Sequence, residues 1–285
     1  MTLPQTIGDA VRALAHHLED AGIESAVSDA RLIVGHALDL SRLAIIGHPD
    51  RDVSPDQWKS IHSLAGRRAA DEPLAHIIGE KEFWSLPFRV TSATLIPRPD
   101  SETLIDALLK VYAGSKGPRR ILDIGTGSGC LLGALLSEWP EAAGVGLDVS
   151  TEAVFIARQN LKALGLSERC EILLADWPAY QTDHPFDLVV SNPPYIPTAE
   201  IITLAPGVRD YEPHTALDGG PDGLDVHRKI ADHVAGLLTL DGRIAVEFGL
   251  GQAEEIQRLY ELAGFSDLQS HTDLGGRERC LLATV

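Results

Sequence analysis

The chain contains the stretch Asp123-Ile124-Gly125-Thr126-Gly127-Ser128-Gly129, which follows an apolar run over 119–122. A second loop, Ser191-Asn192-Pro193-Pro194-Tyr195, follows another apolar run over 186–190. Each loop is therefore expected at the carboxyl end of a buried parallel strand, where open α/β sheets bind ligands. Three alternate glycines let the backbone turn sharply and approach a ligand closely, and the apolar segment 130–139 predicts a helix leaving the loop. The first loop is thus predicted to cradle a nucleoside cofactor.

Strands and helices alternate around these loops. Ser101 is expected to cap a helix, and the predicted strands lie near 119–124, 143–149, 170–175, 186–191 and 242–248, with helices over 129–139, 151–164, 224–238 and 252–263. This order predicts a doubly wound parallel sheet. The tail segments 265–271 and 279–283 are joined by a loop too short for a helical crossover, so they should pair antiparallel. Such a sheet resembles the class I fold of S-adenosylmethionine-dependent methyltransferases rather than a dinucleotide-binding Rossmann domain.

The glycine spacing supports this choice of cofactor. A nicotinamide fingerprint would place its third glycine at Cys130, and the Lys-Ser/Thr of a phosphate-binding P-loop is missing. Asp148 ends the next strand, where its two oxygens can accept hydrogen bonds from ribose hydroxyls. Asp176 and Trp177 end the following strand, where a carboxylate and an indole suit the edge and face of adenine. Although an Asp at a strand end is often a helix cap, several such features at successive strand ends favour S-adenosyl-L-methionine, with S-adenosyl-L-homocysteine as product.

The second loop suits a planar NH2 group. Its N–H bonds can point at Asn192 Oδ1 and at the Pro193 carbonyl, which aims the nitrogen at a sulfonium methyl by orientation, without a strong general base. Pro193 and Pro194 stiffen the loop, and Tyr195 can pack on a flat acceptor. Alone, Asn-Pro-Pro-Tyr is more often a simple turn. At this strand end it predicts Asn192, Pro193 and Tyr195 as catalytic, and Asn192, Pro193, Pro194 and Tyr195 as substrate-binding.

The amino-terminal third has helical periodicity. Thr6 is expected to cap a first helix, Ser28 a second, and Ser54 to begin a capping box for a third, so residues 1–80 predict a helical domain that docks the substrate. The histidines of this region lie at no metal-ligand spacing and are interpreted as surface or core residues; these are His16, His17, His36, His48 and His62.

A linker and a long loop complete the predicted organisation. The aromatic stretch 82–90 and a turn at 91–94 leading into 95–99 predict a β-hairpin linker over 81–99, followed by the methyltransferase domain over 100–285. Pro97 and Pro99 should hold Arg98 as an exposed cation, in a stiff linker or in a wall of the site. The loop 197–225 is long enough to predict a substrate-facing lid. Glu247, at a strand end, is interpreted as structural.

Composition restricts the partners. The 285 residues carry a formal net charge of −17 with 44% hydrophobic residues, which argues against nucleic-acid binding and leaves a protein or a small molecule as substrate. Three separated cysteines indicate neither disulfides nor a zinc site, so we expect no metal and a reducing, cytoplasmic location. The amino terminus lacks signal-peptide features, and no apolar run suggests a membrane span. We expect a monomer.

Several further motifs together resemble the HemK/PrmC family of protein-glutamine N5-methyltransferases, which act on peptide-chain release factors. Besides the two loops they are Pro73-Leu-Ala-His-Ile-Ile-Gly79, Phe83-Trp84, Leu95-Ile-Pro-Arg-Pro-Asp-Ser-Glu102, Tyr211-Glu-Pro213, Ala216-Leu217 and Val246-Glu-Phe-Gly249. His76 replaces the usual tyrosine, and Asp100-Ser101 replaces the commoner Glu-Thr.

The resemblance implies a specific acceptor and a set of contacts. The acceptor would be the glutamine of a release factor's Gly-Gly-Gln motif, held by Asn192 to Tyr195. The residues implied to contact the cofactor are Gly125, Thr126, Gly127, Ser128, Gly129, Asp148, Trp177 and Asn192. Two rival functions stay open at this point: an N6-adenine methyltransferase acting on nucleic acid, and a noncatalytic cofactor-binding scaffold.

Overall fold

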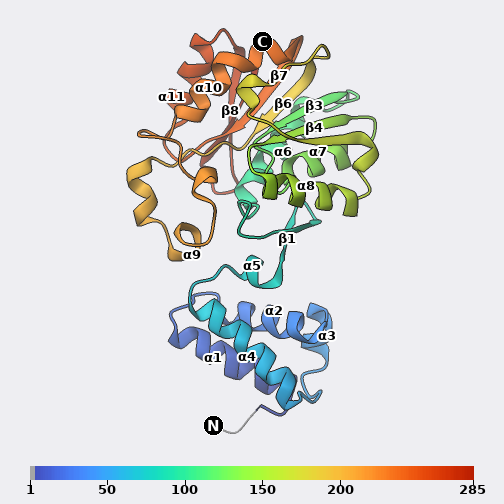
Figure 1. The fold of residues 1–285 in the computed structure, drawn as a ribbon, viewed down its shortest axis with the longest axis vertical. Coiled ribbons are helices and arrows are strands. Elements are labelled where there is room, and N and C mark those ends of the chain that lie inside the picture. Colours follow the sequence, from blue (N-terminus) through green and yellow to red (C-terminus); the bar gives the residue numbers. More distant parts are fainter. Residues whose placement is uncertain (1–3) are drawn as a thin grey trace. The chain divides into compact units, whose positions relative to one another are not determined.

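The computed structural model describes residues 4–285, and the predictions for residues 1–3 lie outside them. The chain divides into two compact units. The helical unit comprises the chain up to Gly79 together with the distant segment Ala205–Tyr211, and the sheet unit comprises Glu80–Leu204 and Glu212–Val285. Figure 1 shows helices alone in the first and a sheet covered by helices in the second.

Five helices form the first part of the helical unit: α1 (Ile7–Asp20), α2 (Ala26–Leu38), α3 (Arg42–Gly47), α4 (Pro55–Ala69) and α5 (Leu74–Ile78). Apolar residues at helical spacing bury one face of each long helix, as Leu14, Leu18, Ile33 and Ile61 show by being fully buried. The predicted caps of the first and third expected helices are confirmed: Thr6 accepts from the Asp9 amide, and Ser54 with Gln57 forms a capping box.

The predicted cap of the second helix is wrong. The helix α2 begins at Ala26, after Ser25, so Ser28 lies inside its first turn. There the Ser28 hydroxyl donates to the Ser25 carbonyl at 2.8 Å instead of accepting from a later amide. A serine hydroxyl can bond either way, so residue type alone does not fix the first residue of a helix.

The helical unit is completed by a segment from far along the chain. The short helix α9 (Pro206–Arg209) lies in Ala205–Tyr211. The Tyr211 hydroxyl donates to the Ala70 carbonyl at 2.9 Å. A Cβ added to Gly207 would lie 2.8 Å from the Asp71 carbonyl oxygen, so a glycine is required for this close approach.

A seven-stranded sheet organises the sheet unit, in the order β5-β4-β3-β6-β7-β9-β8. The strands are β3 (Arg120–Ile124), β4 (Ala143–Asp148), β5 (Cys170–Leu174), β6 (Phe186–Ser191), β7 (Leu238–Glu247), β8 (Ser266–Thr272) and β9 (Glu278–Thr284). The strands β3 to β7 are parallel, whereas β9 pairs antiparallel with β7 and β8. This confirms the predicted fold class. The strand order reverses at β3, which lies between β4 and β6 and therefore marks the switch point of the sheet.

Helices cover both faces of this sheet (Figure 1). They are α6 (Glu102–Val111), α7 (Cys130–Glu138), α8 (Thr151–Ala163), α10 (Asp225–Val234) and α11 (Ala253–Leu262). Alternate strand residues enter opposite cores: Ile121 packs in the core that holds residues of α6, α7 and α8, and Leu122 in the core that holds residues of α10 and α11. Short 3-10 turns complete the unit: η1 (Pro99–Ser101), η2 (Ser167–Arg169), η3 (Trp177–Ala179), η4 (Thr198–Thr203), η5 (His214–Ala216) and η6 (Ala235–Leu237).

The hairpin at the start of the sheet unit has its turn earlier than predicted. The strands β1 (Glu80–Phe83) and β2 (Leu86–Arg89) pair antiparallel, and the turn is Trp84-Ser85 rather than 91–94. Both turn residues have positive φ, 51° and 58°, as a two-residue hairpin of type I′ requires. The Trp84 amide donates to Glu102 Oε1 at 2.8 Å, which fixes this turn despite the unfavourable residue types.

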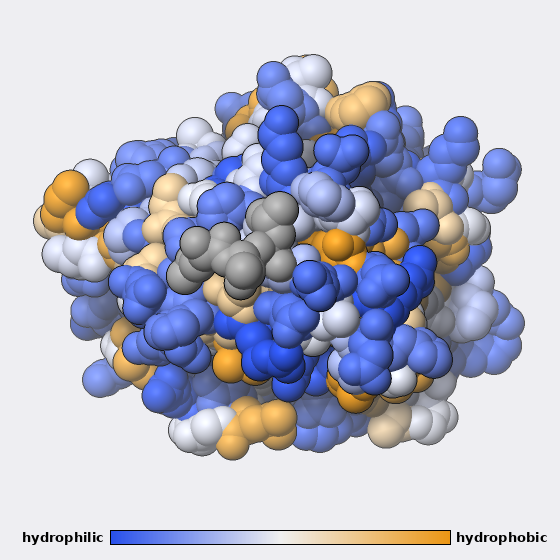
Figure 2. Space-filling model, turned by 90° about the horizontal axis from the view of Figure 1, so that it is seen from below, coloured by the Kyte–Doolittle hydropathy of each residue, from blue (hydrophilic) through white to orange (hydrophobic). Residues whose placement is uncertain are grey.

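The face shown in Figure 2 is largely hydrophilic, with hydrophobic residues scattered over it. Within residues 4–285 no helix combines the length and the apolar character needed to cross a membrane.

Candidate active site

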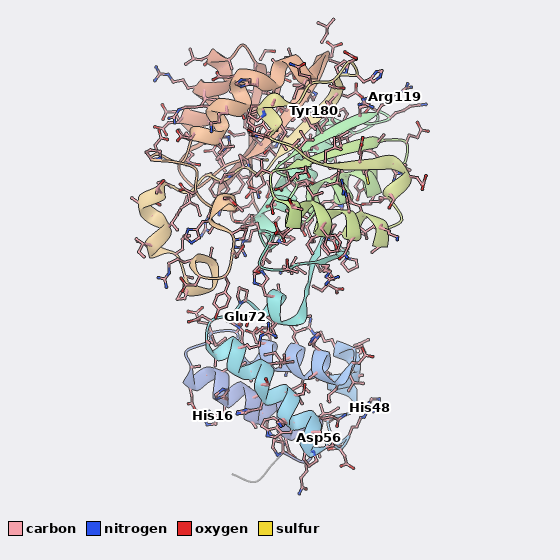
Figure 3. All side chains as sticks on the ribbon, in the orientation of Figure 1. His16, His48, Asp56, Glu72, Arg119 and Tyr180 are labelled. Carbon is pink, nitrogen blue, oxygen red and sulfur yellow. The ribbon has the colours of Figure 1, made fainter. Side chains whose placement is uncertain are left out.

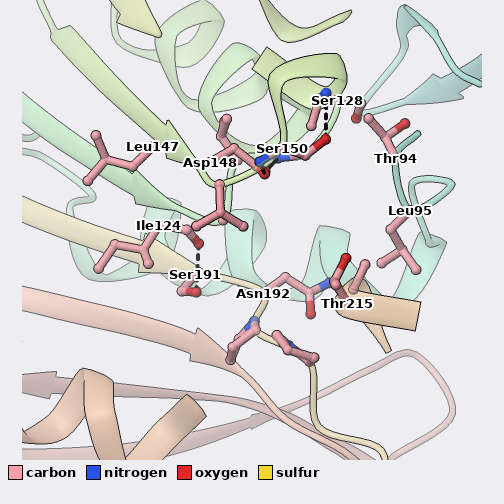
Figure 4. A pocket seen from close by; sticks show the side chains of 18 of the residues that line it. Thr94, Leu95, Ile124, Ser128, Leu147, Asp148, Ser150, Ser191, Asn192 and Thr215 are labelled. Carbon is pink, nitrogen blue, oxygen red and sulfur yellow. Dashed lines mark hydrogen bonds between the residues drawn. The ribbon is translucent and has the colours of Figure 1, made fainter. Parts of the chain in front are cut away.

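A pocket lies at the carboxyl ends of β3, β4, β5 and β6, within the sheet unit (Figure 4). Its lining comes mainly from the loops after these strands and from the segment before α6, with Pro213, Thr215, Ala216 and Val226 added from further along the chain. The predicted site residues that line it are Gly125, Thr126, Gly127, Ser128, Asp148, Trp177, Asn192, Pro193 and Pro194. The structure thus brings these nine predicted residues together around one cavity.

The glycine loop is held open by its backbone conformation. Gly125, Gly127 and Gly129 all have positive φ, at 72°, 54° and 79°. A Cβ added to Gly125 would meet no atom within 4 Å, so this lining residue leaves open space in which a ligand can approach the backbone. Gly129 does not line the pocket. It precedes α7, and a Cβ there would lie 3.3 Å from the Ala157 Cβ, so its small size serves helix packing.

The Asp148 carboxylate connects the loops after β3 and β4. Its Oδ2 accepts from the Gly127 amide and its Oδ1 from the Ser150 amide, both at 2.9 Å. Each carboxylate oxygen can accept a further hydrogen bond, which leaves capacity for a ligand with hydroxyl donors. Trp177 lines the same pocket after β5, and its ring meets His233 edge to face with the centroids 6.0 Å apart.

A buried carboxyl beneath the glycine loop was not assigned a role from the sequence. Asp123 is fully buried, and its Oδ2 accepts from the Thr126 hydroxyl at 2.7 Å. Burial raises the pKa of Asp123 to about 7, and the Thr126 hydroxyl opposes that shift. The position of Asp123 immediately before the glycines was the available signal. The hydrogen bond to Thr126 makes it a brace for the loop.

The acceptor loop begins with an oriented amide. The Asn192 Nδ2 donates to the Ser101 Oγ at 3.1 Å, which leaves Asn192 Oδ1 as the amide atom that can accept from another group. The preceding Ser191 hydroxyl donates to the Ile124 carbonyl at 2.8 Å and ties β6 to β3 directly beside the glycine loop (Figure 4). Pro193 and Pro194 follow in the lining of the pocket.

Tyr195 lies differently from the other residues of this loop. It is not part of the pocket lining, and its hydroxyl donates to Glu247 Oε1 at 3.2 Å. Glu247 is 2% exposed at the end of β7. Burial raises the pKa of Glu247 to about 7, against the lowering effect of the Ser101 and Tyr195 hydroxyls and of the Arg279 charge. The structure therefore gives Glu247 one direct partner in the acceptor loop, Tyr195.

The loop after β6 returns to the pocket through a partly buried ion pair. Glu212 accepts from the Ile96 amide at 3.1 Å and from Arg98 Nη2 at 2.5 Å. The expectation that Arg98 is an exposed cation is wrong, since its side chain is one-third exposed and paired with this carboxylate. The pair anchors the residues next to it, and Pro213, Thr215 and Ala216 line the pocket.

The described histidines form no metal centre. Across residues 4–285 there is no group of three or more His, Cys, Asp or Glu that could hold a metal ion. His16 lies in α1 and His48 directly follows α3, both in the helical unit (Figure 3).

Comparison with known proteins places this geometry in a family. The description "PrmC N-terminal domain" matches residues 9–79, and "Methyltransferase small domain" matches residues 99–204. A release factor glutamine methyltransferase of Rhodospirillum rubrum is 46% identical over 94% of this chain and 82% of its own length. The chain belongs to the release factor glutamine methyltransferase family. Its Caulobacter vibrioides relative of the same description is 41% identical over 99% of this chain and 96% of that protein.

The fold of this methyltransferase is shared with distant solved structures. The N-terminal domain of human METTL16, in complex with SAH, superposes with a TM-score of 0.52 at 18% identity, covering 75% of this chain and 81% of that one. At this identity the likeness concerns the fold alone.

Proposed function

We propose that this enzyme transfers a methyl group from S-adenosyl-L-methionine to the side-chain amide nitrogen, N5, of the glutamine in the Gly-Gly-Gln motif of peptide-chain release factors. The observation that carries the proposal is the Asn192 amide. Its nitrogen is engaged by Ser101, so its oxygen is available at a pocket that also contains the glycine loop. An acceptor oxygen in that place suits the NH2 of a carboxamide.

The pocket residues fit the cofactor. The open backbone of the loop from Gly125 to Gly129 and the Asp148 carboxylate suit the polar parts of a nucleoside, and Trp177 offers an aromatic surface for its base. When bound, S-adenosyl-L-methionine supplies an electrophilic methyl group and leaves as S-adenosyl-L-homocysteine. Thr126, Ser128 and Asn192 complete the proposed contacts.

The protein contributes to the reaction mainly by orienting the glutamine NH2 group. Asn192 Oδ1 and the Pro193 carbonyl would each accept a hydrogen bond from one N–H group of the glutamine NH2. This would direct the free face of the nitrogen toward the methyl carbon. As the N–C bond forms, positive charge develops on nitrogen and these oxygens stabilise it. The C–S bond of the cofactor would break with its electron pair left on sulfur, and the nitrogen would release one proton to water, giving a neutral N-methyl amide. Pro193 and Pro194 hold the loop rigid, and Tyr195, which lies outside the pocket lining and is bonded to Glu247, anchors the end of the loop.

The substrate is proposed to be a protein on grounds of charge. The net charge of −17 opposes binding to a phosphate backbone, whereas a glycine-flanked glutamine is a neutral, narrow group. We assign docking of the release factor to residues 1–80 and the reaction to residues 100–285, with 81–99 as a linker, and we propose that the enzyme acts as a monomer.

The test is methyl transfer to purified release factor beside its Gln-to-Ala variant. We expect labelled methyl on the first, located at N5 by mass spectrometry, and none on the second. Equal labelling of both factors would refute the assignment of the acceptor. The rival N6-adenine activity predicts instead that DNA or RNA is labelled and shifts in a gel at low salt.

A further inference from the structure

A buried asparagine behind the pocket hydrogen-bonds to three backbone groups of the sheet unit. Asn160 lies on α8, is 3% exposed and does not line the pocket. Its Oδ1 accepts from the Arg89 amide at 2.8 Å. Its Nδ2 donates to the carbonyls of Arg89 at 3.0 Å and of Ser128 at 2.8 Å. One side chain thus joins the end of β2 to the glycine loop.

These bonds require an amide at position 160. The side chain of asparagine has two N–H donors and one carbonyl oxygen, and each of them is engaged. The partners also fix its orientation, because the Arg89 N–H needs an acceptor and the two carbonyls need donors. An ionised aspartate of the same shape would offer no donor, and an alanine would offer neither donor nor acceptor.

Both joined segments continue into the lining of the pocket. Ser128 lines it from the glycine loop. Its carbonyl is held by Asn160, and the next amide, that of Gly129, donates to the Thr126 carbonyl at 2.7 Å. On the other side of the bond, three residues (90–92) separate Arg89 from the next part of the lining, which contains Ala93, Thr94, Leu95 and Pro97. The position of Arg89 therefore limits where that part can lie.

Close packing surrounds the amide. A Cβ added to Gly133 of α7 would lie 3.1 Å from Phe88 Cε1 of β2 and 3.2 Å from Leu161 Cδ2 of α8. Ser128 is 2% exposed. Water therefore has little access to the Ser128 carbonyl as a replacement partner, and loss of the Asn160 amide would leave a buried acceptor without a hydrogen bond.

We propose that Asn160 is a positioning residue for the cofactor: its amide holds the glycine loop and the segment 93–97 in the relative placement that cofactor binding requires. This inference rests on the proposed function, in which this pocket holds S-adenosyl-L-methionine. Because the three bonds are made within the protein, cofactor binding need not order the two segments. Asn160 acts through its backbone partners and touches neither cofactor nor substrate.

Two substitutions of Asn160 test the proposal by cofactor affinity. N160D keeps the shape and the acceptor for the Arg89 amide but removes both donors, whereas N160A removes all three bonds. We expect both to raise the Kd of S-adenosyl-L-homocysteine, measured by calorimetry, about 10- to 100-fold. A Kd in N160D within about twofold of wild type would overturn the inference.

The matched control is Q159A, one position earlier on the same helix. Gln159 Oε1 accepts from Arg89 Nη1 at 2.8 Å, so Q159A also breaks a bond between α8 and the end of β2, but that bond does not reach the glycine loop. Its Kd should stay within about twofold of wild type. A rise in Q159A as large as in N160D would contradict the role of the Ser128 carbonyl.

A second control separates positioning from lost stability. I256V removes a buried methyl group from α11, which packs on β8 and β9, and should lower Tm while leaving the Kd within about twofold of wild type. In N160D the KM for the cofactor should rise with the Kd, whereas kcat with release factor stays within about threefold, because Asn192 has a separate partner in Ser101. A fall in kcat with unchanged KM, or a raised Kd in I256V, would refute the assignment.

NMR supplies a readout that needs no release factor, because the chain has two asparagines, Asn160 and Asn192. In enzyme labelled with ¹⁵N-asparagine, the side-chain signals of Asn160 are those lost in N160D. Saturation with S-adenosyl-L-homocysteine should shift these signals and slow the exchange of their hydrogens with deuterium oxide, although Asn160 does not line the pocket. Asn160 signals that do not respond to saturation would contradict the inference.

The two proposals fail in different ways. Lack of cofactor binding by the wild type would refute the proposed cofactor pocket. Cofactor binding that is equally tight in the wild type, N160D and N160A would leave that pocket standing and refute the role of Asn160 alone.

Discussion

Replacement of Glu212 tests how the loop after β6 is anchored to the pocket. E212A removes both bonds of a carboxylate whose side chain is 1% exposed, one from the Ile96 amide and one from Arg98. Because Pro213, Thr215 and Ala216 line the pocket, loss of the anchor should affect stability and ligand binding together. E212Q keeps an acceptor for the Ile96 amide but removes the charge opposite Arg98.

The size of the effect follows from what each partner loses. The Ile96 amide is buried and would lack an acceptor in E212A, which costs about 1–3 kcal/mol. Arg98 is one-third exposed, so water replaces part of its interaction and its loss adds only about 1 kcal/mol. E212A should therefore lower the free energy of unfolding by about 2–4 kcal/mol and E212Q by about 1 kcal/mol.

Thermal unfolding followed by circular dichroism, with calorimetric titration of the cofactor, measures both consequences. A loss of this size in a unit of about 200 residues lowers Tm by roughly 5–10 °C. The matched control is D106A, which removes the exposed Lys110–Asp106 pair at 2.6 Å and should change stability by less than about 1 kcal/mol. If E212A were no less stable than D106A, the buried pair would not be the anchor.

Three further outcomes are expected. N192A should reduce the methyl-transfer rate about 100-fold, while the Kd of the cofactor, measured by calorimetry, changes less than about threefold; parallel losses in both would contradict the role of its oxygen. D148A should weaken cofactor binding about 10- to 100-fold, because it removes a charged acceptor that also holds the Gly127 and Ser150 amides, and unchanged binding would rule that out. For Asp123 the pKa is raised from 3.8 to about 7, so in this range the native state keeps a proton that the unfolded chain has released. The free energy of unfolding of the wild type should therefore fall as the pH rises from about 4 to about 7. Urea unfolding across that range should show a smaller fall in D123N, and identical slopes would exclude the effect.

The parallel sheet and the pocket residues could be predicted because they follow local rules. The apolar strands β3 and β6 are followed by Gly125–Gly129 and by Asn192, which mark where the chain turns at the sheet edge. Because the strands are parallel, these turns lie at the same edge and form one pocket. The antiparallel tail followed from the length of its connecting loop. Periodicity and turn chemistry were sufficient for these elements.

The missed features depend on contacts between distant residues. The hairpin turn at Trp84-Ser85 needs the Glu102 carboxylate, 18 positions away, to accept the Trp84 amide. Arg98 read as exposed because its partner, Glu212, lies 114 positions further along the chain. Glu247 is buried, as expected of a structural carboxylate, but its partner Tyr195 lies 52 positions earlier in the chain and could not be identified from the sequence. Pairs of side chains that are far apart in the chain produce no periodic pattern in the sequence.

The segment Ala205–Tyr211 has a consequence for biosynthesis. Its helix α9 packs in the helical unit, where the backbone at Gly207 approaches Asp71 and Tyr211 bonds to Ala70. A nascent chain that has emerged only as far as Gly79 thus lacks part of the unit it is building. The contacts of Ala70 and Asp71 with this segment can form only after β3 to β6 have been synthesised.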